Sequence, residues 1–167
     1  IILVHLFGRP CDVDKVAEIA KRRGVTLIED CAQAHATKYK GQYLGTFGDM
    51  GCFSFQQSKH MTTGDGGITI TDDEATYWRL RLFADKGWDY RYMGERDHAF
   101  LAPNYRMNEL TGAVAVAQLE KVRDVVERRI HLGRVLTERI ADAPGITALP
   151  LSDDYEVSWW NYIFHIT

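Results

Sequence analysis

The chain has 167 residues, of which 46% are hydrophobic, which suffices for one ordinary domain with an apolar core. The net charge of −3 excludes the basic footprint of a nucleic-acid-binding protein, and no apolar stretch is long enough to span a bilayer. The cysteines Cys11, Cys31 and Cys52 are scattered and odd in number. They indicate neither a disulfide framework nor a CxxC metal site, and they favour a reducing, cytoplasmic setting.

The start of the chain predicts a β-α-β unit. Residues 1–7 are apolar and are expected to form a buried strand. After a turn, Asp12 caps a helix that runs to about Arg23, and Gly24 ends it. The β-branched run at 25–29 is the second strand. The two strands should therefore be parallel, with a right-handed crossover.

The middle of the chain predicts two more strands and a helix. A polar, glycine-containing excursion at 36–50 precedes short strands at 51–55 and 67–71. Asp72 or Asp73 then caps a helix of about a dozen residues. The positions expected to face inward on this helix are Tyr77, Trp78, Leu80, Leu82 and Phe83.

The last part of the chain predicts a long loop, a long helix and a new β-rich region. Residues 86–103 mix aromatics with charges; such a loop is often functional, and the alternative is a mobile surface flap. A helical pattern covers 108–142, with Gly133 expected to mark a break or kink. A Pro-Gly pair stops this helix. The change in composition predicts one domain at 1–143 and the start of a second at 144–167.

Both ends of the chain lie inside predicted strands. The chain opens on Ile1-Ile2-Leu3-Val4 and stops within the alternating pattern of residues 160–167. It has neither an initiator methionine nor a signal-peptide pattern. We therefore expect an internal fragment of a longer protein.

The stretch from residue 54 to residue 67, between the two short strands, is the most unusual in composition. It holds two hydroxyls, Ser54 and Ser58, beside Lys59, and three glycines close behind. A lysine that leaves a sheet is expected to be partly desolvated, which leaves an amine able to attack a carbonyl. The alternative is a solvated surface lysine in a hairpin turn.

Asp30 directly follows the strand at 25–29, about one strand away from Lys59. In open parallel sheets, ligands bind beyond the carboxyl ends of the strands, so Asp30 lies where a site is expected. Its alternative role is a structural cap or ion pair. His5, on an apolar strand, is expected to be a satisfied core histidine, and His35 to lie toward the substrate side.

Six motifs follow one another along the chain: VHLFG at 4–8, EDCAQAH at 29–35, GDMGCFSF at 48–55, SK at 58–59, GDGG at 64–67 and NYRMNE at 104–109. In this order they resemble the sugar aminotransferases of the DegT/DnrJ/StrS family, which depend on pyridoxal phosphate (PLP). The resemblance covers nearly the whole chain. It implies an α/β fold: the large domain of a fold-type I PLP-dependent transferase, with a three-layer, mostly parallel sheet, truncated at both ends and followed by the start of the small C-terminal domain.

The resemblance also implies a role for each of five residues. Lys59 would form the Schiff base with PLP and later move a proton, and Asp30 would pair with the pyridinium nitrogen. Ser54 would bind the phosphate, Gln33 the ring hydroxyl, and Asn104 the phosphate of the neighbouring subunit's cofactor. Each of the last three residues has an alternative without the resemblance: an ordinary strand serine for Ser54, a solvent-facing helix residue for Gln33 and a turn residue for Asn104. No metal site is expected.

These roles imply amino transfer from glutamine or glutamate to a keto-sugar or keto-cyclitol of the scyllo-inosose type, in amino-sugar or aminocyclitol biosynthesis. Residues 56–57 and 61–63 resemble the cyclitol branch of the family. The contribution of Asn104 implies a homodimer with shared active sites. The related PLP-dependent sugar dehydratases carry histidine at the position of the lysine. Here that position is held by Lys59, and His60 follows it by one residue, so the sequence favours transamination over dehydration. A non-catalytic regulator or binding module on the same fold is the remaining alternative.

Overall fold

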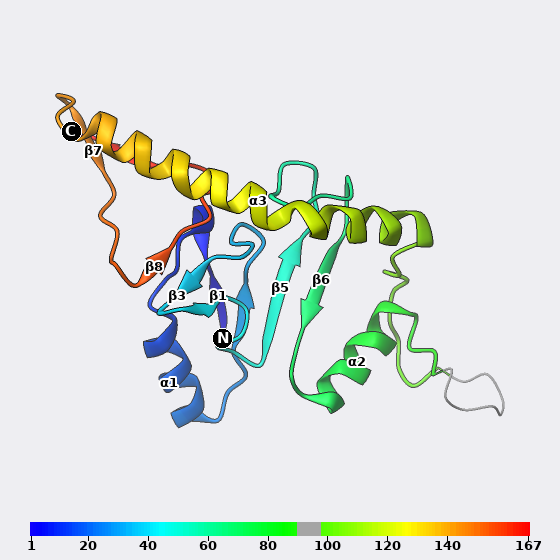
Figure 1. Cartoon of the computed structure of the whole chain (residues 1–167). Coiled ribbons are helices and arrows are strands. Elements are labelled where there is room, and N and C mark those ends of the chain that lie inside the picture. The colour runs from blue at the N-terminus through cyan, green and yellow to red at the C-terminus, as the bar shows by residue number, and fades with distance from the viewer. Residues whose placement is uncertain (90–97) are drawn as a thin grey trace.

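The computed structural model describes residues 1–89 and 98–167, and its centre is a four-stranded sheet (Figure 1). The strand order is β1-β2-β5-β6. The first three strands are parallel, and β6 runs antiparallel to β5. The sheet is therefore mostly parallel, as predicted. The bounds are β1 Ile2–Val4, β2 Ile28–Asp30, β5 Met50–Ser54 and β6 Gly67–Ile70.

The predicted β-α-β unit is present, with a shorter first strand than expected. Helix α1 spans Val13–Arg23 and ends at Gly24, whose left-handed φ of 61° glycine adopts without strain. Asp12 occupies the N-cap position, but no side-chain capping bond is present. The expected buried strand at 1–7 is wrong: β1 stops at residue 4, and the 3-10 turn η1 (Leu6–Gly8) follows. Ile2 is 70% exposed, because no described element covers that face of β1.

The excursion between β2 and β5 folds over the α1 side of the sheet. It contains β3 (Lys38–Tyr39) and β4 (Gln42–Tyr43), and β3 also pairs with β8 (Tyr155–Glu156) from near the end of the chain. This packing creates the hydrophobic core. The buried cluster consists of Val13, Cys31, Ala34, Tyr39 and Leu44.

Helix α2 (Glu74–Ala84) begins as predicted but does not fully bury the expected side chains. The carboxylate of its N-cap, Asp73, accepts a hydrogen bond from the amide of Thr76. None of the helix's described residues is buried, and Tyr77 and Phe83 are 46% and 47% exposed. The prediction is wrong for Tyr77 and Phe83, whereas Trp78, Leu80 and Leu82 are partly buried, as expected of inward positions.

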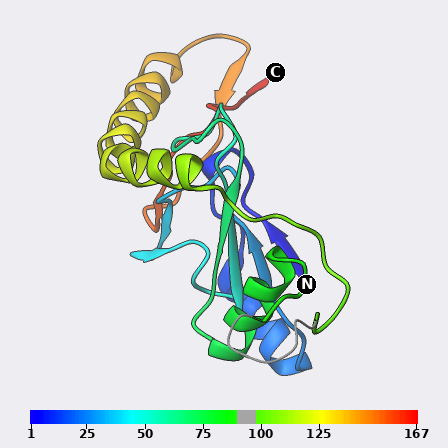
Figure 2. The same ribbon diagram turned by 90° about the vertical axis from the view of Figure 1, so that its right-hand side faces the viewer.

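Helix α3 runs without interruption over Glu109–Ile140, so Gly133 does not break the helix, and the alternative of a kink there stays a prediction. Gly133 instead makes room for Trp159: a Cβ there would lie 2.3 Å from the indole Nε1. Strand β5 points toward α3 (Figure 1), and α3 and α2 lie at opposite ends of the sheet (Figure 2). None of the described helices is long and apolar enough to cross a membrane.

Beyond α3, strands β7 (Ile146–Ala148) and β9 (Phe164–Ile166) pair antiparallel. Strand β9 covers only the last part of the strand expected at 160–167. The segment between β8 and β9 returns to the main sheet and contributes three buried residues, Val157, Ser158 and Trp159. The domain division between residues 143 and 144 stays a prediction.

Candidate active site

Two of the predicted site residues lie at the carboxyl edge of the sheet. Asp30 is the last residue of β2 and Ser54 the last of β5. The register pairs Asp30 with Cys52, and residues two apart on a strand share a face. The carboxylate of Asp30 and the hydroxyl of Ser54 therefore project on the same side of the sheet, and both residues are partly exposed.

Both groups keep hydrogen-bonding capacity to spare. The Oδ1 atom of Asp30 accepts from the amide of Ala32 at 3.0 Å, and no described residue donates to its Oδ2. The Oγ atom of Ser54 accepts from the amide of Gln56 at 3.2 Å, and its own proton has no recorded acceptor among the described residues. A ligand at this edge would thus meet a carboxylate oxygen and a hydroxyl donor.

Lys59 follows the carboxyl end of β5, in the loop that leads to β6, and is half-buried. Its Nζ lies 4.0 Å from the centroid of the Trp160 ring. In residues 1–89 and 98–167, no carboxylate or hydrogen-bond acceptor is recorded for this amino group. The expectation of a partly desolvated lysine agrees with this placement.

Gln33 is joined to Lys59 through two residues that sequence analysis missed. The side-chain oxygen of Gln33 accepts from the amide of Phe7 at 2.8 Å. The carbonyl of Phe7 in turn accepts from the amide of Trp160 at 3.1 Å. Phe7 has a left-handed φ of 59°, a strained value for a bulky residue. Gln33 lies in a turn, so its alternative as a solvent-facing helix residue is wrong.

Asn104 does not join this group. It forms an isolated bridge with Asp85, directly after α2, and its side-chain oxygen accepts from Nε of Arg106 at 3.3 Å. No recorded contact of the described residues links it to Lys59 or Asp30. The structure therefore brings four of the five predicted residues to one edge of the sheet and leaves Asn104 exposed elsewhere.

Glu29, beside Asp30, points to the opposite face and is fully buried. Its Oε1 accepts from the amides of Phe47 and Gly48, at 2.7 and 2.8 Å. Its Oε2 accepts from the amide of Gly45 at 2.8 Å and lies 3.1 Å from Nε2 of His5. Burial raises the pKa of Glu29, but these hydrogen bonds outweigh it and hold the pKa below its usual value. The expectation that His5 is a satisfied core histidine is confirmed.

The ligand atoms of His5, Glu29 and Cys31 lie within 4.8 Å of one another, a spacing that a metal ion can bridge. Both oxygens of Glu29 are already engaged by the donors above, however. Nδ1 of His5 faces the amide of Cys11 at 3.4 Å, and burial raises the pKa of the Cys31 thiol. Such a set of groups is a packed hydrogen-bonded cluster rather than a metal centre.

His35 and His60 form a buried pair on the α3 side of the sheet, with ring centroids 5.4 Å apart. Nε2 of His60 lies 3.0 Å from the carbonyl oxygen of Ser158, and the ring of His35 is buried beside the backbone of Ser54. Burial lowers the pKa of each histidine to about 4. The ring of His35 packs between Phe53 and His60, and its expected place on the substrate side stays a prediction.

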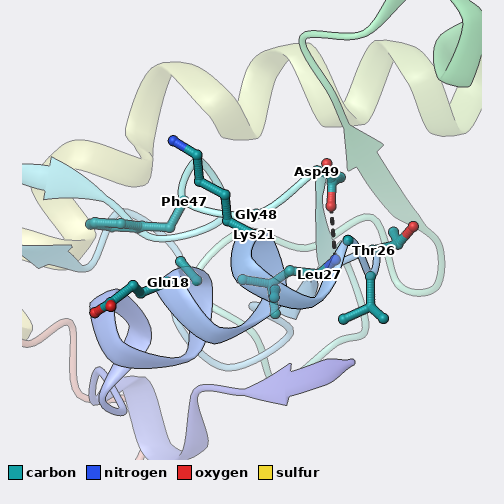
Figure 3. Close-up of a pocket in the computed structure, with 11 residues that line it drawn as sticks. Glu18, Lys21, Thr26, Leu27, Phe47, Gly48 and Asp49 are labelled. Carbon is teal, nitrogen blue, oxygen red and sulfur yellow. Dashed lines mark hydrogen bonds between the residues drawn. The ribbon is translucent and has the colours of Figure 1, made fainter.

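A hollow of about 680 Å³ lies between α1 and the start of β2 (Figure 3). The hydrogen bond drawn there joins the amide of Leu27 to the carboxylate of Asp49, at 2.8 Å. Because Leu27 precedes β2, this hollow is at the amino end of the strand, and none of the predicted site residues lines it. It is therefore separate from the candidate active site.

A mostly parallel α/β sheet with a lysine, a carboxylate and a hydroxyl at its carboxyl edge fits fold-type I PLP-dependent transferases, and aminotransferases of that fold are its structural neighbours. Residues 1–167 match the DegT/DnrJ/EryC1/StrS aminotransferase family, and the chain belongs to it. Aminotransferases of this family are PLP-dependent.

Two relatives and one solved structure illustrate the match. The chain is 41% identical over 140 residues to GDP-perosamine synthase of Escherichia coli O157:H7, covering 84% of this chain and 38% of that protein. It is 34% identical over 154 residues to a protein of Streptoalloteichus tenebrarius provisionally named L-glutamine:3-amino-2,3-dideoxy-scyllo-inosose aminotransferase, covering 92% and 36%. The crystal structure of the aminotransferase TlmJ from Streptoalloteichus hindustanus superposes with a TM-score of 0.91 at 28% identity, covering 99% and 45%. The chain thus spans less than half the length of each.

Proposed function

We propose that the protein carrying these residues is a PLP-dependent aminotransferase. It would move an amino group from glutamine or glutamate to a keto-sugar or keto-cyclitol. The observation that carries this proposal is the gathering of Lys59, Asp30 and Ser54 at one edge of the sheet, each with an uncommitted group.

The donor set at this edge fits the chemistry of PLP, which presents an aldehyde, a ring nitrogen and a phosphate. Lys59 offers an amine with no described carboxylate partner, which suits an aldehyde. Asp30 offers a carboxylate oxygen without a described donor, which suits a protonated ring nitrogen. Ser54 offers a hydroxyl proton, which suits a phosphate oxygen. We therefore assign these three residues to hold the cofactor.

The bound cofactor supplies an electron sink for the carbon that loses or gains the amino group. Lys59, once its amine is free, would act as the base and acid that moves a proton at that carbon. Asp30 would keep the ring nitrogen protonated. Gln33 would hold the loop at Phe7 through its side-chain oxygen and offer its amide nitrogen toward the ring hydroxyl.

We also propose a homodimer with shared active sites. The side-chain oxygen of Asn104 is bound to Arg106, which leaves its amide nitrogen to donate to a phosphate on the neighbouring subunit. The domain division into 1–143 and 144–167 belongs to the same proposal. A cytoplasmic setting is supported by the three cysteines, all in the described part of the chain, which form no disulfide.

The first test is the visible absorption spectrum of the purified protein after addition of PLP. A band should appear that sodium borohydride traps as a covalent adduct, and peptide mapping should place the adduct on Lys59. The Lys59→Ala variant should lack both band and adduct. Lys121→Ala, which removes an exposed lysine of α3, should behave as the unmodified protein does. A protein without any trappable band would refute the proposal.

A second test separates the substrates. The names of the two relatives point to a nucleotide-linked sugar and to a cyclitol with glutamine as donor. Glutamine and glutamate should be compared as donors, with keto-cyclitols and nucleotide keto-sugars as acceptors, and formation of the amino product measured by mass spectrometry. Loss of a hydroxyl from the sugar without transfer of nitrogen would indicate the dehydratase alternative. A trapped adduct with no turnover of any pair would favour a regulator.

A further inference from the structure

Trp160 is held by three hydrogen bonds to three separate parts of the fold. Its amide donates to the carbonyl of Phe7, in the turn after β1, at 3.1 Å. Its carbonyl accepts from Nη1 of Arg129, on α3, at 3.2 Å. Its indole Nε1 donates to the carbonyl of Ser58, in the lysine loop, at 3.0 Å. The ring thus has a fixed place beside Lys59.

The contact between this ring and Lys59 has the geometry of a cation–π interaction. The Nζ atom lies 4.0 Å from the ring centroid, inside the limit of about 6 Å for such contacts. Within residues 1–89 and 98–167, no carboxylate is recorded next to this ammonium group. A buried ion pair would bind the group far more firmly, because separating it leaves an uncompensated charge. The ring therefore holds the amino group in place without locking it there.

We propose that Trp160 is a positioning residue for Lys59. Its ring holds the amino group at the carboxyl edge of the sheet whenever the amine is not bonded to the cofactor, and releases it for reaction. The link to the cofactor rests on the proposed function; the contact between the two side chains does not.

The ring and the indole N–H of Trp160 can be tested separately. Trp160→Phe keeps an aromatic face and loses the hydrogen bond to Ser58, whereas Trp160→Leu loses both. If Trp160 served only to anchor the loop through its N–H, the two variants would behave alike. If the ring holds Lys59, the phenylalanine variant retains most of the effect.

The first arm of the experiment needs no cofactor. The PLP-free protein is treated briefly with acetic anhydride, and acetylation of Lys59 is measured by mass spectrometry relative to the exposed Lys121. The Trp160→Leu variant should raise the labelling of Lys59 by about 2- to 30-fold, the factor that corresponds to the usual range of cation–π attraction. The Trp160→Phe variant should stay within about twofold of the unmodified protein, since phenylalanine also attracts cations.

The second arm uses PLP. The nitrogen of Lys59 bonds to the aldehyde carbon with loss of water, and borohydride then delivers hydride to that carbon and fixes the adduct. Formation of the adduct should be several-fold slower in Trp160→Leu than in Trp160→Phe, because a lysine side chain that is no longer held must find its reactive position from many rotamers. In the Trp160→Leu variant, Lys59 should thus react faster with acetic anhydride and slower with PLP than it does when an aromatic ring is present.

These opposite signs distinguish positioning from general loosening, which would also raise the labelling of Lys86, a partly buried lysine paired with Asp85. Equal labelling of Lys59 in the leucine variant and the unmodified protein would overturn the inference, as would faster PLP addition in that variant. A protein that forms no PLP adduct at all would overturn the proposed function instead, and the acetylation arm would still decide whether the ring holds Lys59.

Discussion

Replacement of Glu29 by glutamine removes one buried charge while keeping the size of the side chain. Each carboxylate oxygen faces two donors: the amides of Phe47 and Gly48 on one side, and the amide of Gly45 and Nε2 of His5 on the other. The new amide nitrogen must take one of these positions and would face two donors there. The amide of Cys11 donates to the other ring nitrogen of His5, which favours Nε2 of His5 as a donor rather than an acceptor toward residue 29.

The expected loss follows from this geometry. Two hydrogen bonds to a charged group disappear, at about 1.5–3 kcal/mol each, so Glu29→Gln should destabilise the fold by about 3–6 kcal/mol. Since a typical domain is stable by about 5–15 kcal/mol, this is a large fraction of the total. Far-UV circular dichroism during urea unfolding measures it directly.

The same substitution should change the pH dependence of stability. The pKa of Glu29 lies below its usual value of 4.5, so its contribution is complete above that pH and is lost as the pH falls through the folded pKa. The glutamine variant should lack this part of the acid limb. Glu18→Gln, the same change on an exposed side chain of α1, serves as the control and should leave the urea midpoint nearly unchanged, because it removes only an exposed ion pair with Arg22. A Glu29→Gln variant as stable as the Glu18→Gln variant would refute the reasoning.

Three further changes have definite expected results. Asp30→Asn should weaken PLP binding in an absorbance titration by about 10- to 100-fold through loss of a charged hydrogen bond, while Asp72→Asn should not. Gly133→Val should displace the Trp159 ring, because the ring already occupies the Cβ position. Tryptophan emission should shift, and the free energy of unfolding, measured by urea titration, should fall by about 1–3 kcal/mol. The pKa of His35 is lowered to about 4, so the stability it contributes is present above 6.5 and lost as the pH falls from 6.5 toward 4. His35→Phe should therefore lose less stability between pH 7 and pH 5, as measured by urea midpoints.

Sequence analysis located Asp30 and Lys59 because their placement follows from chain order. Residues at or shortly beyond the carboxyl ends of the strands of a mostly parallel sheet meet at one edge, whatever the exact length of each strand. Glu29 was within reach of the same logic. Consecutive residues of a strand point to opposite faces, so an Asp30 that faces the site requires a Glu29 that faces the core and must find donors there. The order of the two carboxylates therefore predicts a buried, hydrogen-bonded Glu29.

Other parts of the site have no local signal. Trp160 lies 102 residues beyond Ser58 in sequence, and nothing in either segment indicates that they meet. The hydrogen bond from Phe7 to Gln33 depends on a left-handed backbone in a turn that resembled the end of a strand. Two predicted inward positions of α2, Tyr77 and Phe83, were wrong for a different reason. An apolar stripe on a helix predicts that this face packs against other residues, but it does not say whether those residues belong to the described chain.

The residues that pack on the lysine loop lie far along the chain, and this separation affects the order in which contacts form while the ribosome makes the protein. His60 and Ser58 reach their partners, Ser158 and Trp160, across 98 and 102 residues. A ribosome adds residues at about 5–20 per second, so about 5–20 seconds separate the emergence of the loop from that of its partners. During that interval Lys59 lacks the aromatic ring that lies beside it in the folded chain. The contacts around Lys59 are therefore complete only after residue 160 has been added, and a stall between residues 60 and 158 would leave Lys59 without its aromatic neighbour.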